Sequence, residues 1–254
     1  MVTPNGELTG QIALVTGGAL NIGRAICLDL ADAGAAVCVN AKSSKAEAEA
    51  LVAEIEGQGG RAFAHMADVT DPDAVAAMVE AIVGQYGGLN ILINNASYRA
   101  RTPLAELSLE RWRLAQSVTV EGSFLCAQAA VPHITEAGVG TIINIGGAAA
   151  YIGVKDRLHA ATAKGAISAM TRSLAQEVAG TGITVNCVVP GVIDTVRGAS
   201  AGKLPPGMDG DSNLLGRKGK PEEVAALVRA LCGLAGGYVT GQVIHCNGGM
   251  YLGA

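Results

Sequence analysis

The chain has 254 residues, of which 50% are hydrophobic and 16% charged, so it can bury a sizeable core. Its net charge is −4 and it has no basic cluster, which argues against a nucleic-acid partner. No apolar run approaches the roughly 18 residues of a membrane span, and residues 1–7 lack the pattern of a signal peptide. We therefore expect a cytoplasmic protein with no membrane partner.

The first elements expected are a buried strand, a glycine-rich turn and a helix. Apolar residues fill 11–15, and an apolar-periodic segment covers 25–30. The stretch Thr16–Gly23 lies between them. Glycines let a backbone approach a pyrophosphate closely, and the first N–H groups of a helix point at it. The turn favours a dinucleotide, while tight packing of strand on helix is the alternative that the turn alone leaves open.

The end of the next strand, predicted at 35–40, bears on the choice of cofactor. A carboxylate there would bind the adenine ribose diol and repel a 2′-phosphate. The chain instead has Lys42, Ser43 and Ser44, one cation and two hydroxyls that suit a phosphate. We predict NADP(H) rather than NAD(H); the alternative is that Lys42 is a solvated loop charge.

The strand predicted at 61–67 ends in the acidic stretch that begins with Asp68. An aspartate at a strand end can accept a hydrogen bond from an adenine amino group or cap the next helix. Asp71 is the better cap, since Pro72 follows it as a first helical residue. This leaves Asp68, with Val69 beside it, for the adenine ring.

The strand at 90–93 runs into a pair of asparagines. We expect Asn94 and Asn95 to tie neighbouring strands together and to leave backbone atoms near the ribose. Further helices are predicted at 45–58, 73–86, 108–130, 159–178 and from Pro221, with Gly122 interrupting the pattern of the third. Further strands are predicted at 141–147, 184–191 and 242–246, and loops at 148–157 and 203–213.

This alternation, without a break in composition, predicts an α/β protein with a single doubly wound parallel sheet of Rossmann type. We expect one dinucleotide-binding domain over 1–254, ligands at the carboxyl ends of the strands, and a mobile substrate loop near 196–216. The 6 cysteines form no Cys-x-x-Cys pair and the 4 histidines are scattered, so no metal site is expected.

Five motifs resemble the short-chain dehydrogenase/reductase family in order and spacing, nearly from end to end. They are Thr16–Gly23, Asp68-Val69, Asn94-Asn95-Ala96, Pro190-Gly191 with Thr195, and Gly248-Gly249. Asn21 replaces the family's second glycine and tolerates its backbone angles, and Ser97 replaces the glycine after the asparagine pair.

The resemblance implies a homotetramer packed through the helices around 108–130 and 159–178. It also implies a cofactor-binding set that includes the phosphate and adenine contacts suggested above. The set comprises Gly17, Leu20, Asn21, Ile22, Gly23, Lys42, Ser43, Asp68, Val69, Asn95, Ala96, Ser97, Lys164, Pro190, Gly191, Ile193 and Thr195.

The catalytic positions depart from the family pattern. In the family, a tyrosine transfers the proton, a lysine one turn later lowers its pKa and holds the nicotinamide ribose, a serine holds the carbonyl, and an asparagine completes a water relay. Lys164 matches the lysine by its spacing to Asn186. Ala160 then stands at the tyrosine position, Gly147 at the serine and Thr119 at the asparagine.

Two side chains near Lys164 are candidates to replace the proton donor. Tyr151 and Lys155 spell Tyr-x-x-x-Lys, but the motif begins too soon after Gly147 for the family geometry, and a loop tyrosine near the pocket mouth is the simpler interpretation. A histidine titrates near neutrality, which suits His159. Adjacent helical residues point about 100° apart, so His159 can serve only if the helix begins after it.

Charged residues around the same segments have open roles. Lys155, Asp156 and Arg157 are further candidates for the donor, or form a solvated loop face. Arg99 and Arg101 follow the asparagine strand and either face an anionic substrate or are plain surface charges.

Three functions are compatible with these patterns. The first is an NADP(H)-dependent oxidoreductase acting on a small carbonyl or alcohol by an atypical proton path, with Lys164, His159 and Tyr151 as catalytic candidates. The second is a non-redox lyase or isomerase on the same scaffold. The third is a nucleotide-binding protein with little catalysis. A small molecule is the expected substrate in the first two cases.

Overall fold

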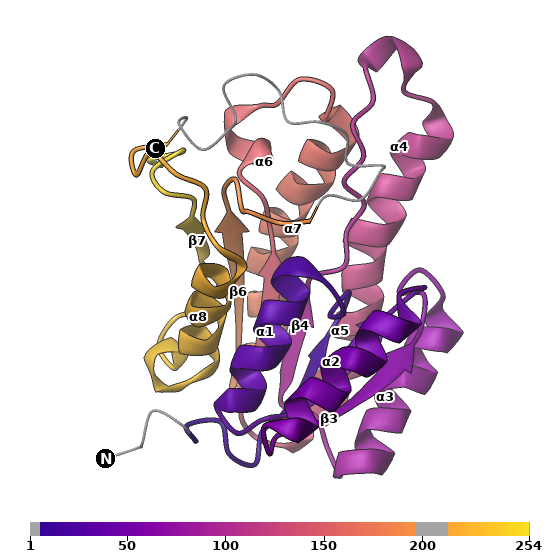
Figure 1. Ribbon diagram of the computed structural model, residues 1–254, viewed down its shortest axis with the longest axis vertical. Helices are drawn as coiled ribbons and strands as arrows, with labels where there is room; N and C mark the ends of the chain where they lie inside the picture. Colours follow the sequence, from indigo (N-terminus) through magenta and orange to yellow (C-terminus); the bar gives the residue numbers. More distant parts are fainter. Residues whose placement is uncertain (1–5, 197–212, 254) are drawn as a thin grey trace.

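The strands of this chain form one parallel sheet. The computed structural model describes residues 6–196 and 213–253. Its seven-stranded sheet has the order β3-β2-β1-β4-β5-β6-β7 (Figure 1). The strands are β1 Ile12–Val15, β2 Ala36–Ala41, β3 Arg61–Met66, β4 Ile91–Asn94, β5 Gly140–Ile145, β6 Ile183–Pro190 and β7 Val243–Cys246. The predicted α/β class with a doubly wound parallel sheet is confirmed.

Both faces of the sheet are buried, because successive side chains of a strand point to opposite sides and both sides are apolar. In β1, Ala13 and Val15 belong to one core while Ile12 and Leu14 belong to the other. An apolar run without alternation therefore needs helices on both faces. The sequence supplies them between the strands.

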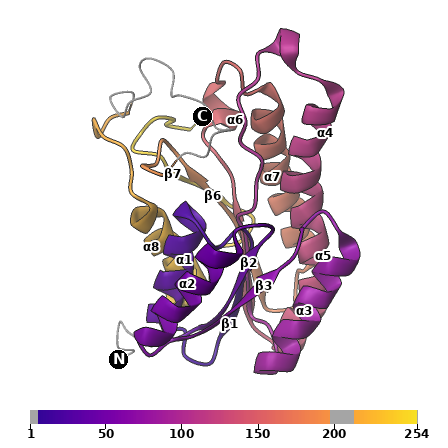
Figure 2. The same cartoon turned by 45° about the vertical axis from the view of Figure 1, so that its right-hand side comes forward.

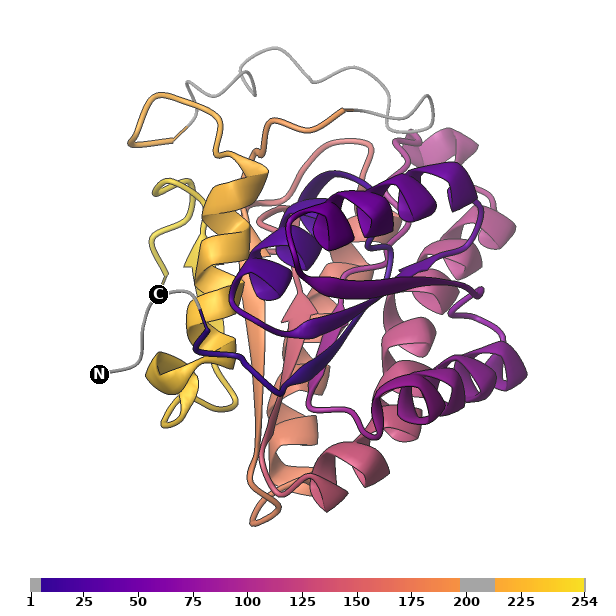
Figure 3. The same cartoon turned by 60° about the horizontal axis from the view of Figure 1, so that its bottom comes forward.

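The helices lie in two layers. They are α1 Asn21–Asp32, α2 Lys45–Gly57, α3 Pro72–Tyr86, α4 Leu109–Gln116, α5 Gly122–Glu136, α6 Ala149–Ile152, α7 Leu158–Glu177 and α8 Pro221–Cys232, with short 3-10 turns at Leu104–Glu106 and Leu234–Gly236. The helices α1, α2 and α8 cover one face, and α3, α5 and α7 cover the other (Figure 2). Figure 3 shows the same two layers from below, with the indigo and gold helices opposite the magenta ones.

The strand order reverses between β1 and β4, since β2 and β3 extend the sheet to one side of β1 and β5, β6 and β7 extend it beyond β4. In open parallel sheets, the crevice at such a reversal, at the carboxyl ends of the strands, is where ligands bind. The segments that follow β1 and β4 are the glycine-rich turn and the asparagine pair.

Two predicted elements differ in the structure. The helix expected over 108–130 is interrupted by a π-helical turn at Ser117–Glu121, after which α5 begins at Gly122. A Cβ at Gly122 would stand 2.7 Å from a methyl group of Val69, so the glycine permits this close approach of helix to strand end. The loop expected over 148–157 contains the short helix α6, whose four residues are too few to produce a helical periodicity in the sequence.

The N-terminus of α3 has the predicted cap. The Asp71 side chain accepts hydrogen bonds from the N–H groups of Asp73 at 3.0 Å and Ala74 at 3.2 Å, which makes it the predicted cap of α3. All six cysteines are free, and the described residues contain no group of side chains arranged to hold a metal. Within 6–196 and 213–253, no helix is long and apolar enough to span a membrane. Most of the substrate loop expected near 196–216 lies outside the described residues.

Candidate functional site

The turn between β1 and α1 is held in a conformation that requires its glycines. Gly17 has φ +58°, in the left-handed region that L side chains rarely adopt. A Cβ at Gly23 would lie 2.3 Å from the Gly17 carbonyl oxygen, so the first turn of α1 packs directly on the loop backbone. Asn21 has φ +54°, as expected of an asparagine at a position that the family gives to glycine.

The asparagine pair after β4 holds this turn in place. The Asn95 side chain donates to the carbonyl oxygens of Thr16 and Gly17, both at 2.9 Å. The Asn94 side chain donates to Asn144 Oδ1 at 2.9 Å, which links β4 to β5. The pair ties neighbouring strand ends together, as predicted, because amide side chains can satisfy backbone groups that the ends of the ladder leave unpaired.

These segments surround a cavity of about 380 Å³, within the size range of ligand sites. The predicted residues that line it come from four separate parts of the chain. They are Gly17, Leu20, Asn21, Ile22, Gly23, Asn95, Ala96, Ser97, Lys164, Pro190, Gly191, Ile193 and Thr195. Its size, its glycine-built edge and the N-terminus of α1 beside it suit a dinucleotide with a diphosphate.

The remaining predicted contacts lie outside this cavity. Lys42, Ser43, Asp68 and Val69 do not line it. Lys42 and Asp68 instead form an ion pair of 2.6 Å between the ends of β2 and β3. Burial opposes ionisation of Asp68, but the hydrogen bonds from Lys42 and Thr70 hold the pKa of its carboxyl below the ordinary value. The cation expected for a 2′-phosphate and the carboxylate expected for adenine thus already contact each other.

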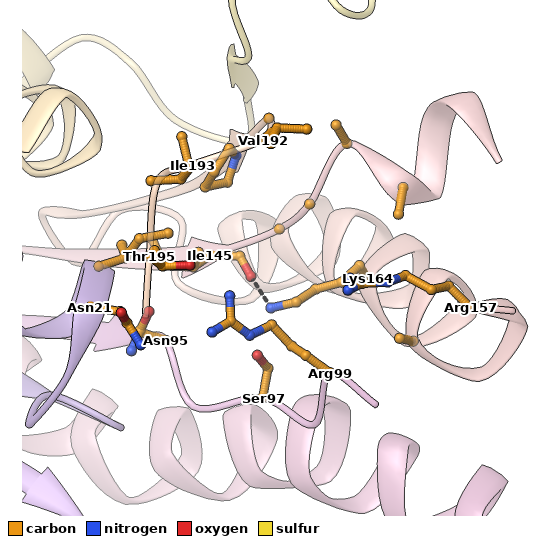
Figure 4. A pocket seen from close by; sticks show the side chains of 18 of the residues that line it. Asn21, Asn95, Ser97, Arg99, Ile145, Arg157, Lys164, Val192, Ile193 and Thr195 are labelled. Atoms are coloured by element: carbon orange, nitrogen blue, oxygen red, sulfur yellow. Dashed lines mark hydrogen bonds between the residues drawn. The ribbon is translucent and has the colours of Figure 1, made fainter. Parts of the chain in front are cut away.

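The Lys164 side chain extends from α7 into the cavity, and its amine lies at the carboxyl end of β5. Its Nζ donates to the Ile145 carbonyl oxygen at 2.5 Å (Figure 4). The side chain is partly accessible through the cavity, yet protein surrounds the amine. Desolvation therefore lowers the pKa of Lys164 from 10.5 to about 8, and the positive charge of Arg99 adds to this effect while Cys187 opposes it.

The cavity wall beside Lys164 carries a methyl group at Ala160 and no side chain at Gly147. Ala160 and Lys164 both line the cavity, because residues four apart share one face of a helix. Gly147 lies opposite, and a Cβ there would stand at an ordinary 3.5 Å from Lys164 Cγ. Thr119 is buried in the π-helical turn and does not line the cavity.

His159 could be the proton donor only if the helix began after it, and the helix begins before it. Helix α7 begins at Leu158, so His159 is already helical and points away from the face that carries Ala160 and Lys164. Its side chain is buried, does not line the cavity, and packs against Tyr98 with ring centroids 6.0 Å apart. Burial lowers the pKa of His159, so the imidazole is neutral at neutral pH.

Tyr151 also lies away from the cavity. Its hydroxyl is 2.7 Å from Ser168 Oγ on α7, and its ring packs against His245 and Tyr251 at 4.6 and 5.1 Å. The literal Tyr-x-x-x-Lys motif is not one helical turn, because α6 ends at Ile152, before Lys155. Contrary to the expectation from the sequence, Tyr151 therefore does not lie at the pocket mouth. It belongs to α6 and forms an aromatic cluster with His245 and Tyr251.

The cavity includes residues that the sequence did not single out for it. Tyr98 lines it, as does Met250 near the C-terminus. Arg157, one of the candidate donors named from the sequence, lines it as well. Met250 is brought there because Gly191 lies against Asn247, where a Cβ would come within 2.8 Å of the Asn247 Cα. The glycine motif at 248–249 was the available signal for this segment, but no sequence pattern places it beside β6.

The chain is similar to known proteins over nearly its whole length. A family model described as "Enoyl-(Acyl carrier protein) reductase" matches residues 17–251. A 3-oxoacyl-[acyl-carrier-protein] reductase FabG of Staphylococcus aureus is 37% identical over 241 residues, which cover 94% of this chain and 98% of that protein. A short chain dehydrogenase from Burkholderia cenocepacia, solved in complex with NADP, is 35% identical with a TM-score of 0.88, covering 96% of this chain and 99% of that one.

The chain belongs to the short-chain dehydrogenase/reductase family. The resemblance seen in the motifs is thereby confirmed, as is the expected oxidoreductase type. A second structure of similar fold, a blue fluorescent protein from a metagenomic library in complex with NADPH, is 36% identical with a TM-score of 0.90 and covers 97% of this chain and 100% of that one.

Proposed function

We propose that this chain is an NADP(H)-dependent oxidoreductase that interconverts a small carbonyl compound and its alcohol, with Lys164 as the proton donor in the reductive direction. The observation that carries the proposal is the placement of the Lys164 amine inside the cavity bordered by the glycine turn. The NADP and NADPH held by two similar structures support the choice of cofactor.

The cofactor would be held by the glycine turn, the asparagine loop and the segment after β6. The N–H groups in the first turn of α1 have no partners within the helix, which suits the diphosphate. Lys42 would bind the 2′-phosphate by exchanging its partner Asp68 for it. When bound, the cofactor supplies the hydride that reduces the carbonyl carbon.

The proton must come from a titratable group that lines the cavity. Tyr98, Lys164 and three arginines qualify by position, and an arginine stays protonated in proteins. Lys164 titrates close to neutrality, so its ammonium can give a proton to the carbonyl oxygen as negative charge develops there. Its hydrogen bond to the Ile145 carbonyl oxygen holds the amine in place before and after this transfer.

The small residues beside Lys164 support direct proton transfer from its amine. Because Ala160 has only a methyl group and Gly147 has no side chain, neither residue places a proton-carrying group between the Lys164 amine and the cavity. A positioned general acid contributes about 10²- to 10⁴-fold in rate. A direct ammonium donor keeps part of that contribution without the tyrosine.

Fluorescence titration with NADPH and NADH, followed by absorbance at the reduced nicotinamide band with a panel of ketones and aldehydes, tests the proposal. We expect tighter binding of NADPH and substrate-dependent oxidation. The Lys164→Met variant should bind NADPH but lose turnover. Turnover retained in Lys164→Met and lost in Tyr98→Phe would assign the proton to Tyr98 instead. NADPH binding with no oxidation by any carbonyl would favour a non-redox or purely binding role.

The assembly expected from the family is a further part of the proposal. Along α4 and α5, which follow each other through the π-helical turn, Leu109 is 60% exposed and Phe124 51% exposed. Exposed apolar groups on these helices suit a contact between copies of the chain. Light scattering on the purified protein should give the mass of a tetramer.

A further inference from the structure

The cavity is lined by positive charge on one side. Arg99, Arg101, Arg157 and Lys164 line it, and among the described residues of its wall there is no aspartate or glutamate. The first two follow β4, the third lies just before α7 and the fourth is on α7. Two segments, the loop after β4 and the N-terminal part of α7 with its cap, thus bring cations to the same space.

The cations gather at the end of the cavity away from the glycine turn. In Figure 4, Asn21 and Asn95 lie on one side, while Arg99, Lys164 and Arg157 extend into the other. The Arg99 guanidinium points toward the Lys164 amine and Ser97. The diphosphate of a dinucleotide is served by the N-terminus of α1, so these cations belong to a different ligand or to a different part of one.

Like charges at close range in a partly enclosed space repel one another strongly, since the effective dielectric constant is well below that of water. The charge of Arg99 acts directly on the Lys164 amine and helps to lower its pKa. An anion placed between them would relieve this repulsion. Arg101 also donates to the Lys155 carbonyl oxygen at 3.4 Å, so part of its role is to hold the segment before α7.

We infer that the substrate carries an anionic group, a carboxylate or a phosphate, beside its reacting carbonyl, and that Arg99 is the residue that binds this anion, with Arg101 and Arg157 around it. That the substrate also carries a reacting carbonyl rests on the proposed function, whereas the anion site does not. Arginine is suited to this task because its planar fork can donate two parallel hydrogen bonds to a carboxylate or phosphate. The anion would also orient the carbonyl toward Lys164.

Matched pairs of substrates test the inference. Oxo acids with the carbonyl at position 2, 3 or 4 are compared with their methyl esters, and dihydroxyacetone phosphate with dihydroxyacetone. We expect kcat/KM to favour the anionic member of at least one pair by roughly 10- to 100-fold, the value of a hydrogen bond between charged groups. Arg99→Gln should remove that preference mainly through KM, Arg99→Lys should restore part of it, and Arg113→Gln, an exposed arginine of α4, serves as the control.

A binding measurement separates this inference from the proposed function. The same acids and esters are titrated by calorimetry into wild type and Arg99→Gln without any cofactor. Binding of an acid that depends on Arg99, with no NADPH oxidation, would uphold the anion site and reject the oxidoreductase proposal. NADPH oxidation at equal kcat/KM for acids and esters would do the reverse. The pair that shows the preference distinguishes a carboxylate from a phosphate.

Discussion

The titration of Lys164 offers the sharpest test of the site. The folded protein lowers the pKa of this amine from 10.5 to about 8. At about 1.4 kcal/mol for each factor of ten, this costs the folded protein up to about 3 kcal/mol wherever the amine is protonated in both states. Accessibility through the cavity makes this figure an upper limit. Lys164→Met should therefore raise the free energy of unfolding at pH 7.

The sign of the pH dependence follows from proton binding. Between pH 8 and 10.5 the unfolded chain binds more protons at this position than the folded one, so the stability of the wild type rises with pH across that window. The advantage of Lys164→Met should be full below pH 8 and vanish toward pH 10.5. Urea unfolding of both proteins at pH 7, 8, 9 and 10 measures it, with Lys45→Met on the exposed face of α2 as the control.

The same titration should appear in catalysis. If the ammonium of Lys164 gives the proton, kcat/KM for carbonyl reduction should fall about tenfold per pH unit at pH values above the pKa of about 8. A stability difference that is equal at pH 7 and pH 10 would show that the amine does not titrate in this window. A rate that stays constant up to pH 10 would show that another group donates the proton.

Three further predictions concern the cofactor site and the altered catalytic positions. Gly23→Ala should destabilise the fold by about 1–3 kcal/mol and weaken NADPH binding, because its Cβ would lie 2.3 Å from the Gly17 carbonyl oxygen; thermal unfolding and fluorescence titration measure both. Lys42→Ala should weaken NADPH at least tenfold more than NADH, and equal losses would contradict its phosphate role. Ala160→Tyr combined with Gly147→Ser should raise carbonyl reductase activity by about 10²-fold or more, since both positions face Lys164; no gain in a folded double variant would show that the site serves other chemistry.

Local features of the chain were readable because their physical causes are local. The cap at Asp71 needs only a carboxylate followed by proline, and the structure has it. The left-handed backbone at Asn21 follows from an asparagine in a glycine-rich turn. The shared face of Ala160 and Lys164 follows from the 3.6-residue period of a helix. The alternation of strands and helices, together with apolar runs that bury both sheet faces, was sufficient for the fold class.

Contacts between distant segments were not readable in the same way. The ion pair of Lys42 with Asp68 depends on β2 and β3 being neighbours, and each residue alone suggested a separate ligand contact. The short distance along the chain between Gly147 and Tyr151 predicts a loop tyrosine near the pocket mouth, but the Tyr151 hydroxyl faces Ser168 on the next helix. A side chain's direction out of a short helix depends on what packs against it, and no periodicity records that.

The amino-acid sequence by itself determined the sheet, the glycine turn, the asparagine pair and the helix face that Ala160 and Lys164 share, because each is a matter of residue type and spacing. Only the tertiary structure decided which side chains share the cavity. Arg99, Arg157 and Met250 come from three segments far apart in the chain, and they meet because parallel strands end at the same edge of the sheet. Their joint electrostatic field, and with it the lowered pKa of Lys164, arises from that convergence and from burial.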